Sequence, residues 1–361
     1  MKIALLSYST KPRGGVVHTL ALAEALAALG EDVTVWTLGR GGDAGFFRPV
    51  NPAVRLQIVP FPDGPPEETV GARILRSIAT LRTAFDPTPY DVVHAQDCIS
   101  ANAAGRCVRT VHHLDHFTTP ELAACHERAI VEPYAHVCVS EAVAGELAAG
   151  WGIEAQVIPN GVAYDRFAAT DPAARASWRA RLGPYVLTVG GIEPRKGSLD
   201  LLEAYALLRT ARPDVRLVIA GGETLFDYRD YRAGWEARAA ELAVDPVVLG
   251  QVDEDELPAL VAAADAFAFP SLKEGFGLAA MEALAAGVPL VVRDLPVLRE
   301  VFGGAAQFAA TPPDLATELG HALTTVDPAR AAAGRALAAR HTWDAAARSH
   351  LDFYRSLDPR S

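Results

Sequence analysis

Two segments of this chain, far apart in the sequence, open with the same order of structural signals. The apolar runs Ile3–Tyr8 and Tyr185–Val189 have the length of strands, and each is followed by a loop rich in glycine, proline and basic residues and then by a helical stretch rich in Ala and Leu. Strand and helix signals alternate along the rest of the chain. Such alternation is typical of parallel sheets covered by helices. We therefore predict an α/β protein with two Rossmann-like domains of similar plan.

The length of 361 residues fits about two domains of ordinary size. We expect a first domain over residues 1–165 and a second over residues 180–342. Asn160-Gly161 is a turn signal at the boundary, and the Ala/Arg-rich stretch up to Tyr185 predicts a linker helix. Ligands of open α/β sheets bind beyond the carboxyl ends of the strands, so two facing domains would enclose a binding cleft.

Composition excludes some classes of protein. The net charge of −11 argues against a nucleic-acid partner, and no run resembles a signal peptide or a membrane span. A predicted helix over 72–85 carries arginines that form no single basic face, so peripheral membrane contact stays open but unsupported. The cysteines lack C-x-x-C spacing and predict reduced thiols in the cytoplasm. They are Cys98, Cys107, Cys125 and Cys138.

The segment from Glu274 to Glu282 is the most informative motif, because it leads from an apolar strand over 265–269 into a helix. Unpaired N–H groups in the first turn of such a helix suit a diphosphate, and Gly275 and Gly277 would let a ligand approach the backbone closely. If the helix starts early, both carboxylates lie on about the same side and could bind sugar or ribose hydroxyls. That combination suits a nucleotide sugar.

A purely structural interpretation of the same segment also exists. Ser271-x-x-Glu274 has the spacing of a capping box, in which the two side chains only cap the helix. Glu282 is the one polar residue in a run of apolar positions, which indicates a buried carboxylate that needs a partner.

Basic residues gather in the loops between strands and helices. Three of the four lysines, Lys11, Lys196 and Lys273, fall in such loops. Arg195 and Lys196 directly precede a predicted helix, where two cations oppose the helix dipole unless an anion joins them. Ordinary solvated surface cations are the alternative. No G-x-G-x-x-G follows the first strand, so a dinucleotide oxidoreductase is disfavoured.

Two acidic or histidine-rich clusters invite a metal interpretation. His112, His113, Asp115 and His116 follow an expected strand over 106–111, but they are bunched in one loop, and we favour a polar strand end facing the cleft. The acid-x-acid run over 253–255 opens a predicted helix over 254–264, where acidic residues ordinarily complement the helix dipole.

Three segments together resemble a known family. Ile158–Val162, Gly190–Gly197 and Phe269–Glu282 match, in order and spacing, the retaining glycosyltransferases of family 4 with the GT-B fold, and the resemblance covers nearly the whole chain. It implies two Rossmann-like domains facing each other across a cleft. It also implies that a last helix over about 343–361 crosses back to the first domain.

The resemblance implies roles for individual residues. Arg195 and Lys196 would hold the diphosphate, Glu274 would bind hydroxyls of the donor sugar, Glu282 the ribose, and His112 would position the donor sugar. The remaining donor-binding positions would be Gly14, Gly15, Gly191, Val252, Gly275, Phe276, Gly277 and Leu278.

The implied reaction moves a sugar from a nucleotide diphosphate to the hydroxyl of a small-molecule, glycan or lipid-linked acceptor, with retained configuration and with no metal or cofactor. The alternatives are an epimerase or hydrolase of the same fold and a non-catalytic nucleotide-sugar-binding protein. The chain departs from the family pattern at Ala163, where an acidic residue is common, over 221–235, and at His113 and His116. The base, the sugar and the acceptor therefore stay open.

Overall fold

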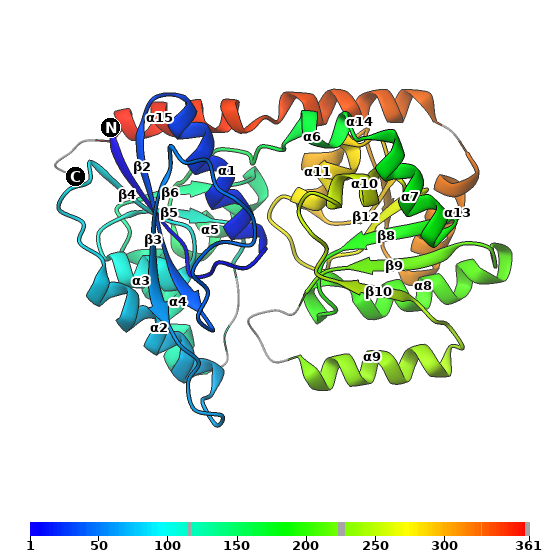
Figure 1. Cartoon of the computed structure of the whole chain (residues 1–361), viewed down its shortest axis with the longest axis horizontal. Helices are drawn as coiled ribbons and strands as arrows, with labels where there is room; N and C mark the ends of the chain where they lie inside the picture. The colour runs from blue at the N-terminus through cyan, green and yellow to red at the C-terminus, as the bar shows by residue number, and fades with distance from the viewer. Residues whose placement is uncertain (115–116, 118, 223–227, 326, 358–361) are drawn as a thin grey trace. The chain divides into compact units, whose positions relative to one another are not determined.

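The computed structural model describes residues 1–114, 117, 119–222, 228–325 and 327–357. The chain divides into two compact units: unit 1 is Met1–Gly161 with Trp343–Ser361, and unit 2 is Val162–Thr342. Each unit carries one parallel sheet with helices packed against it (Figure 1). The predicted α/β class with two Rossmann-like sheets is confirmed.

In the described part of unit 1 the sheet has seven strands in the order β3-β2-β1-β4-β5-β6-β7. Its strands are β1 (Lys2–Leu6), β2 (Asp32–Arg40), β3 (Arg55–Phe61), β4 (Val92–Ala95), β5 (Val108–Val111), β6 (Ala135–Cys138) and β7 (Gln156–Val157). Its helices are α1 (Gly14–Ala28), α2 (Val70–Ala84), α3 (Cys98–Ala104), α4 (Pro120–Val131), α5 (Glu141–Trp151) and α15 (Trp343–Ser356).

In the described part of unit 2 the sheet has six strands in the order β10-β9-β8-β11-β12-β13. They are β8 (Tyr185–Val189), β9 (Arg216–Ala220), β10 (Val247–Gly250), β11 (Ala266–Phe269), β12 (Leu290–Arg293) and β13 (Gln307–Ala309). Its helices are α6 (Tyr164–Ala168), α7 (Pro172–Leu182), α8 (Ser198–Ala211), α9 (Arg229–Glu241), α10 (Leu257–Ala262), α11 (Leu278–Ala285), α12 (Pro296–Phe302), α13 (Pro312–Thr324) and α14 (Pro328–Arg340), with a single 3₁₀ turn, η1 (Pro194–Lys196).

The sheet of unit 1 is buried on both faces, which explains its continuous apolar strands. Ile3 and Leu5 of β1 pack with apolar residues of α1 and α15 on one face, whereas Ala4 and Leu6 pack with α2, α3 and α4 on the other. Successive strand residues point to opposite faces, so most positions of the central strands are apolar.

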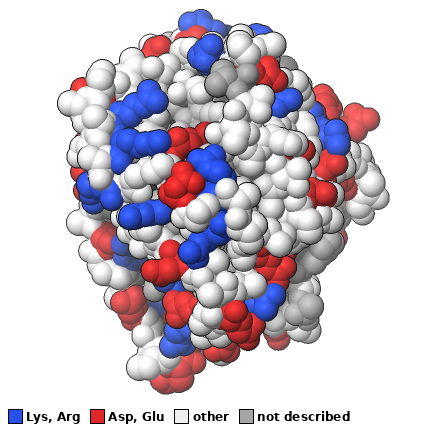
Figure 2. All heavy atoms as spheres, turned by 90° about the vertical axis from the view of Figure 1, so that its right-hand side faces the viewer, with Lys and Arg blue, Asp and Glu red and all other residues white. Residues whose placement is uncertain are grey.

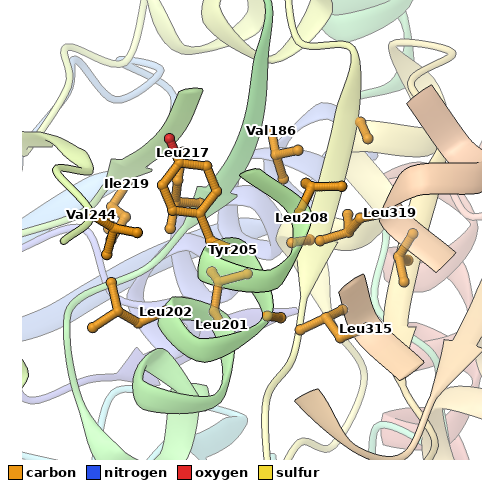
Figure 3. Packing of buried hydrophobic residues seen from close by; sticks show 14 of the residues in the cluster. Val186, Leu201, Leu202, Tyr205, Leu208, Leu217, Ile219, Val244, Leu315 and Leu319 are labelled. Carbon is orange, nitrogen blue, oxygen red and sulfur yellow. The ribbon is translucent and has the colours of Figure 1, made fainter. Parts of the chain in front are cut away.

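One face of the sheet in unit 2 packs on α8, α9 and α13. Figure 3 shows Leu201 and Leu208 of α8 lying against strand residues such as Val186, with Leu315 and Leu319 of α13 completing the cluster. All of these side chains are almost fully buried. This core fixes α8, and therefore also the loop that leads into it.

The strand order of each sheet reverses at one point. In unit 2 the chain runs outward through β9 and β10 and then returns to β11 on the other side of β8. The loops after β8 and β11 therefore leave the sheet next to each other, at the topological switch point where ligands of such sheets bind. The corresponding point in unit 1 lies between β1 and β4.

Several predicted boundaries are wrong. The linker before Tyr185 is two helices, α6 and α7, rather than one. Helix α1 begins at Gly14, so Gly14 and Gly15 form its first turn. Helix α10 begins at Leu257, so Asp253 and Glu254 are not in a first helical turn and do not complement its dipole there.

Helix α15 packs on α1 within unit 1. Within the described residues, we find no helix that combines the length and the apolar character needed to cross a bilayer. Figure 2 shows one face of the molecule, on which basic and acidic side chains lie side by side.

Candidate functional site

The loops after β8 and β11 form a small pocket at the switch point of unit 2. A backbone bond from the N–H of Leu272 to the carbonyl of Arg195, 2.8 Å long, joins the two loops. Ten residues line the pocket: Thr188, Val189, Gly190, Gly191, Lys196, Ser198, Leu201, Ile219, Phe269 and Ser271. The predicted donor-binding residues Gly191 and Lys196 are among them.

A cluster of opposite charges lies beside this pocket. Lys196 donates from Nζ to Oε1 of Glu274 at 2.5 Å, and Arg195 donates from Nη1 to the same oxygen at 3.1 Å. A second carboxylate, Glu193, accepts from Nη2 of Arg195 at 3.3 Å and is almost fully buried. The ammonium of Lys196 also lies 5.2 Å from the centre of the Phe269 ring, a cation–π distance. Two cations are thus held in fixed positions at the pocket.

The capping-box interpretation of Ser271 and Glu274 is wrong. Helix α11 begins at Leu278, its N-cap is Gly277, and no side chain caps it. Glu274 lies outside the helix and is bound by cations from the other loop, so the argument that it shares a helical face with Glu282 is wrong as well. The first turn of α11 keeps its N–H groups without a side-chain cap, as an anion site requires.

Glycine is required in this turn for steric reasons also. Gly277 has φ of 100°, and a Cβ there would lie 3.0 Å from the ring of Phe302. The side chain of Phe276 is buried and packs 5.7 Å from the ring centre of His341, so only its backbone can contact a ligand. Gly275 is buried and Leu278 half-buried.

Gly221 begins the segment where the chain departs from the family pattern, and the sequence predicted no contact for it. It follows β9, and a Cβ at this position would overlap the carbonyl group of Gly190 and lie 2.7 Å from the amide nitrogen of Gly191. The backbone at the end of β9 therefore packs directly on the pocket loop. The sequence has a Gly-Gly pair after this strand. Such a pair can indicate either a turn or a close contact between two backbone segments, and the local sequence does not distinguish the two.

Glu282 lies in the second turn of α11 and keeps part of its surface exposed. Burial raises the pKa of its carboxyl to about 8; nearby Glu254 raises this pKa further, and Arg166 lowers it. Arg166 is bound to Glu254, through both the side chain and the main-chain carbonyl. Among the described residues, no side chain or main-chain group bonds to the carboxylate of Glu282, so the partner expected for a buried acid is not supplied by the protein.

The acidic run over 253–255 therefore has a structural partner, Arg166, in place of a helix dipole. Val252 precedes this run and lies half-buried in the loop after β10. Within the part of the chain that the structure describes, no group of three or more His, Cys, Asp or Glu side chains is arranged to hold a metal ion.

His112 follows β5 in unit 1 and lies over the first turn of α1. Its ring is 3.8 Å from the position of a Cβ on Gly15, which brings these two predicted residues together. Gly14 is exposed at the start of the same turn. Burial, and next the charge of Arg109, holds the pKa of His112 well below its usual value, and its Nε2 atom has no hydrogen-bond partner in the described structure.

The residues that follow His112 are described only in part. His113 is half-buried, whereas Asp115 and His116 lie outside the described residues, as do residues 223–227 of the other departure from the family pattern. None of the four cysteines forms a disulfide in the described structure.

A buried histidine, His18, was missed entirely from the sequence. It lies on α1 with its ring centre 4.8 Å from that of His112, and its Nδ1 is 2.9 Å from Oδ1 of Asn160. A histidine in an apolar helix gives no local signal of such a contact, because its partners come from distant segments.

Comparison with known proteins agrees with this geometry. Residues 12–166 match the family model described as Glycosyltransferase Family 4, and residues 174–326 match the model described as Glycosyl transferases group 1. The chain is 30% identical to a phosphatidyl-myo-inositol mannosyltransferase of Mycobacterium tuberculosis, over 99% of this chain and 97% of that protein.

Solved structures share the fold. The sucrose-phosphate synthase of Thermosynechococcus elongatus superposes with a TM-score of 0.81 at 21% identity over 100% of both chains. The HepE protein of Anabaena, solved with UDP-glucose, gives a TM-score of 0.76 at 19% identity over 99% of this chain and 100% of that one. The chain therefore belongs to glycosyltransferase family 4, has the GT-B fold, and is an enzyme that transfers a sugar from a nucleotide donor to an acceptor.

Proposed function

We propose that this glycosyltransferase uses a nucleoside-diphosphate sugar, retains the configuration of the transferred sugar and needs no metal ion. The observation that carries the proposal is the pair Arg195 and Lys196, fixed on one oxygen of Glu274 beside the uncapped first turn of α11. A diphosphate at this turn would meet two cations and several backbone N–H groups at once. The complex of HepE with UDP-glucose supports a donor of the same chemical class here.

The two cations can do the work that a metal ion does in other transferases. As the bond between sugar and phosphate breaks, negative charge develops on the leaving diphosphate. Arg195 and Lys196 would stabilise that charge in the transition state, because they are already held in place before the reaction starts. A Lys ammonium has three N–H donors, and the described structure shows one of them used, by Glu274.

The remaining residues would bind and orient the donor. Glu274, fixed by the cations, would accept hydrogen bonds from sugar hydroxyls, and His112 would position the donor sugar. Glu282, whose carboxylate has no partner among the described residues, would accept the ribose hydroxyls. The backbone of Val252 would contact the base.

In our proposal the sugar keeps its configuration because the acceptor hydroxyl attacks it on the same face from which the diphosphate leaves. An oxygen of the leaving phosphate would take the proton of the acceptor hydroxyl on that face, so no enzyme carboxylate need act as nucleophile. The acceptor is a hydroxyl compound of the small-molecule, glycan or lipid-linked class. We place the reaction in the cytoplasm, which four cysteines without a disulfide among them support.

Product analysis tests the proposal. The enzyme would be incubated with UDP-, GDP- and ADP-sugars and an acceptor panel, with and without EDTA, and the anomeric proton of the product read by NMR. We expect one donor to give a product with the anomeric configuration of the donor at a rate that EDTA leaves unchanged. An inverted product, or loss of the rate in EDTA, would contradict it. Donor consumption that never yields a transferred sugar would indicate a hydrolase or an epimerase.

A further inference from the structure

We propose that His18 is a positioning residue that fixes the orientation of His112. The inference rests on the proposed role of His112 at the donor sugar. His18 begins the second turn of α1 and is 1% exposed, so it cannot contact substrate itself. It touches His112 edge to face, with 4.8 Å between ring centres and 79° between ring planes.

The hydrogen bond to Asn160 determines which nitrogen of His18 carries the proton. The amide oxygen of Asn160 can only accept, so Nδ1 of His18 donates to it across 2.9 Å and Nε2 carries the lone pair. Burial keeps the pKa of His18 well below its usual value, so the ring is neutral. One tautomer, in one orientation, therefore packs against His112.

His112 packs against two residues of α1 that lie one turn apart. A Cβ on Gly15, in the first turn, would lie 3.8 Å from the ring of His112, and the ring of His18, in the next turn, meets it edge to face. The Nε2 atom of His112 has no hydrogen-bond partner in the described structure. The contact with α1 therefore restrains the ring where a hydrogen bond at Nε2 does not, and removal of His18 would remove one of these two contacts.

His18 also contacts two residues, Asn160 and Trp343, that lie where the chain leaves unit 1 and where it returns to it. Asn160 precedes the division at Gly161, and Trp343 begins the returning segment; the rings of His18 and Trp343 are 5.3 Å apart. Any buried histidine needs an acceptor for its ring N–H, so the contact with His112 is what distinguishes a positioning role from a structural one.

The test compares variants of His18 with a matched buried histidine. His136, on β6, is also buried and bonds to the carbonyl of Ile130 at 2.7 Å, a partner that plays no part in the contact between His18 and His112. We expect His18→Phe to lower kcat at least about tenfold, since misplacement of a catalytic group by about 1 Å can cost on the order of 100-fold. The donor KM should change less than about twofold, and His136→Phe should leave kcat unchanged.

A second pair of variants keeps the test valid if His18→Phe fails to fold. Asn160→Asp retains an acceptor oxygen for Nδ1 of His18, whereas Asn160→Leu has none. We expect kcat to survive in the first and fall in the second, with the same nucleoside-diphosphate affinity in both. Equal kcat in the two variants, or an unchanged kcat in folded His18→Phe while His112→Ala is impaired, would overturn the inference. Full activity of His112→Ala would instead refute the proposed function of His112.

Discussion

Replacing Gly221 by alanine should disrupt the donor pocket without touching a charged residue. The φ of Gly221 is not in the left-handed region, so the backbone itself accepts alanine, and only space is limiting. The new Cβ would overlap the carbonyl carbon and oxygen of Gly190, whereas ordinary contacts begin at 3.4 Å. The loop carrying Gly190 and Gly191 must therefore move by about 1 Å.

The loss of folding stability in Gly221→Ala can be bounded. Overpacking of this kind destabilises by about 1–3 kcal/mol, and each kcal/mol lowers Tm by about 2–4 °C in a protein unit of 150–250 residues. Because the displaced loop borders the pocket and its Gly190 lies against the stem of Lys196, nucleoside-diphosphate affinity should fall by about tenfold.

The next residue provides a matched control. Among the described residues, a Cβ on Gly222 would meet the side chain of Gln251 alone, at an ordinary 3.6 Å. Differential scanning fluorimetry and isothermal titration calorimetry on Gly221→Ala and Gly222→Ala would compare the two. If Gly221→Ala bound nucleoside diphosphates as tightly as Gly222→Ala and the wild type, the claim that the end of β9 supports the pocket loop would be refuted.

Further predictions concern the charged residues and the turn. Lys196→Ala and Glu274→Ala should each lower the rate of sugar transfer at least about tenfold, whereas Arg232→Ala, which removes an exposed ion pair on α9, should not; steady-state rates decide this. Because the pKa of Glu282 is raised from 4.5 to about 8, the folded state keeps a proton that the unfolded state has lost between these pH values, and the free energy of unfolding falls as pH rises through this window. Glu282→Gln should remove that fall. Urea denaturation should therefore show that the free energy of unfolding of the variant, relative to that of the wild type, is higher at pH 8 than at pH 5. The same difference between the two proteins at both pH values would contradict the raised pKa. Gly277→Ala should lower the stability, measured by the same method, by about 1–3 kcal/mol, because its φ is positive and an aromatic ring is 3.0 Å away.

The sequence predicted those features that depend on short segments. The bounds of β8 were predicted correctly, because it is a compact apolar run with glycine just beyond its end. The family motifs identified the loops after β8 and β11, and the structure brings Arg195, Lys196 and Glu274 into direct contact.

Features that depend on distant partners were not predictable. Ser271 and Glu274 have the spacing of a capping box. Glu274 instead accepts hydrogen bonds from two cations in a loop almost 80 residues earlier. Helix α11 begins only after Gly277, whose φ is positive. His18 interacts with Asn160 and with a ring on the last helix, segments that only the fold brings together. Local propensity contains no information about such contacts.

The central claim, that the loops after β8 and β11 bind a nucleoside diphosphate through Arg195 and Lys196, is tested most directly by calorimetry. UDP, GDP, ADP and dTDP would be titrated into the wild type and into Lys196→Ala. Since a hydrogen bond to a charged group contributes about 1.5–3 kcal/mol, we predict that at least one diphosphate binds the wild type and binds the variant at least about tenfold more weakly. Binding of equal strength to both proteins, or no binding of any diphosphate to the wild type, would contradict the account.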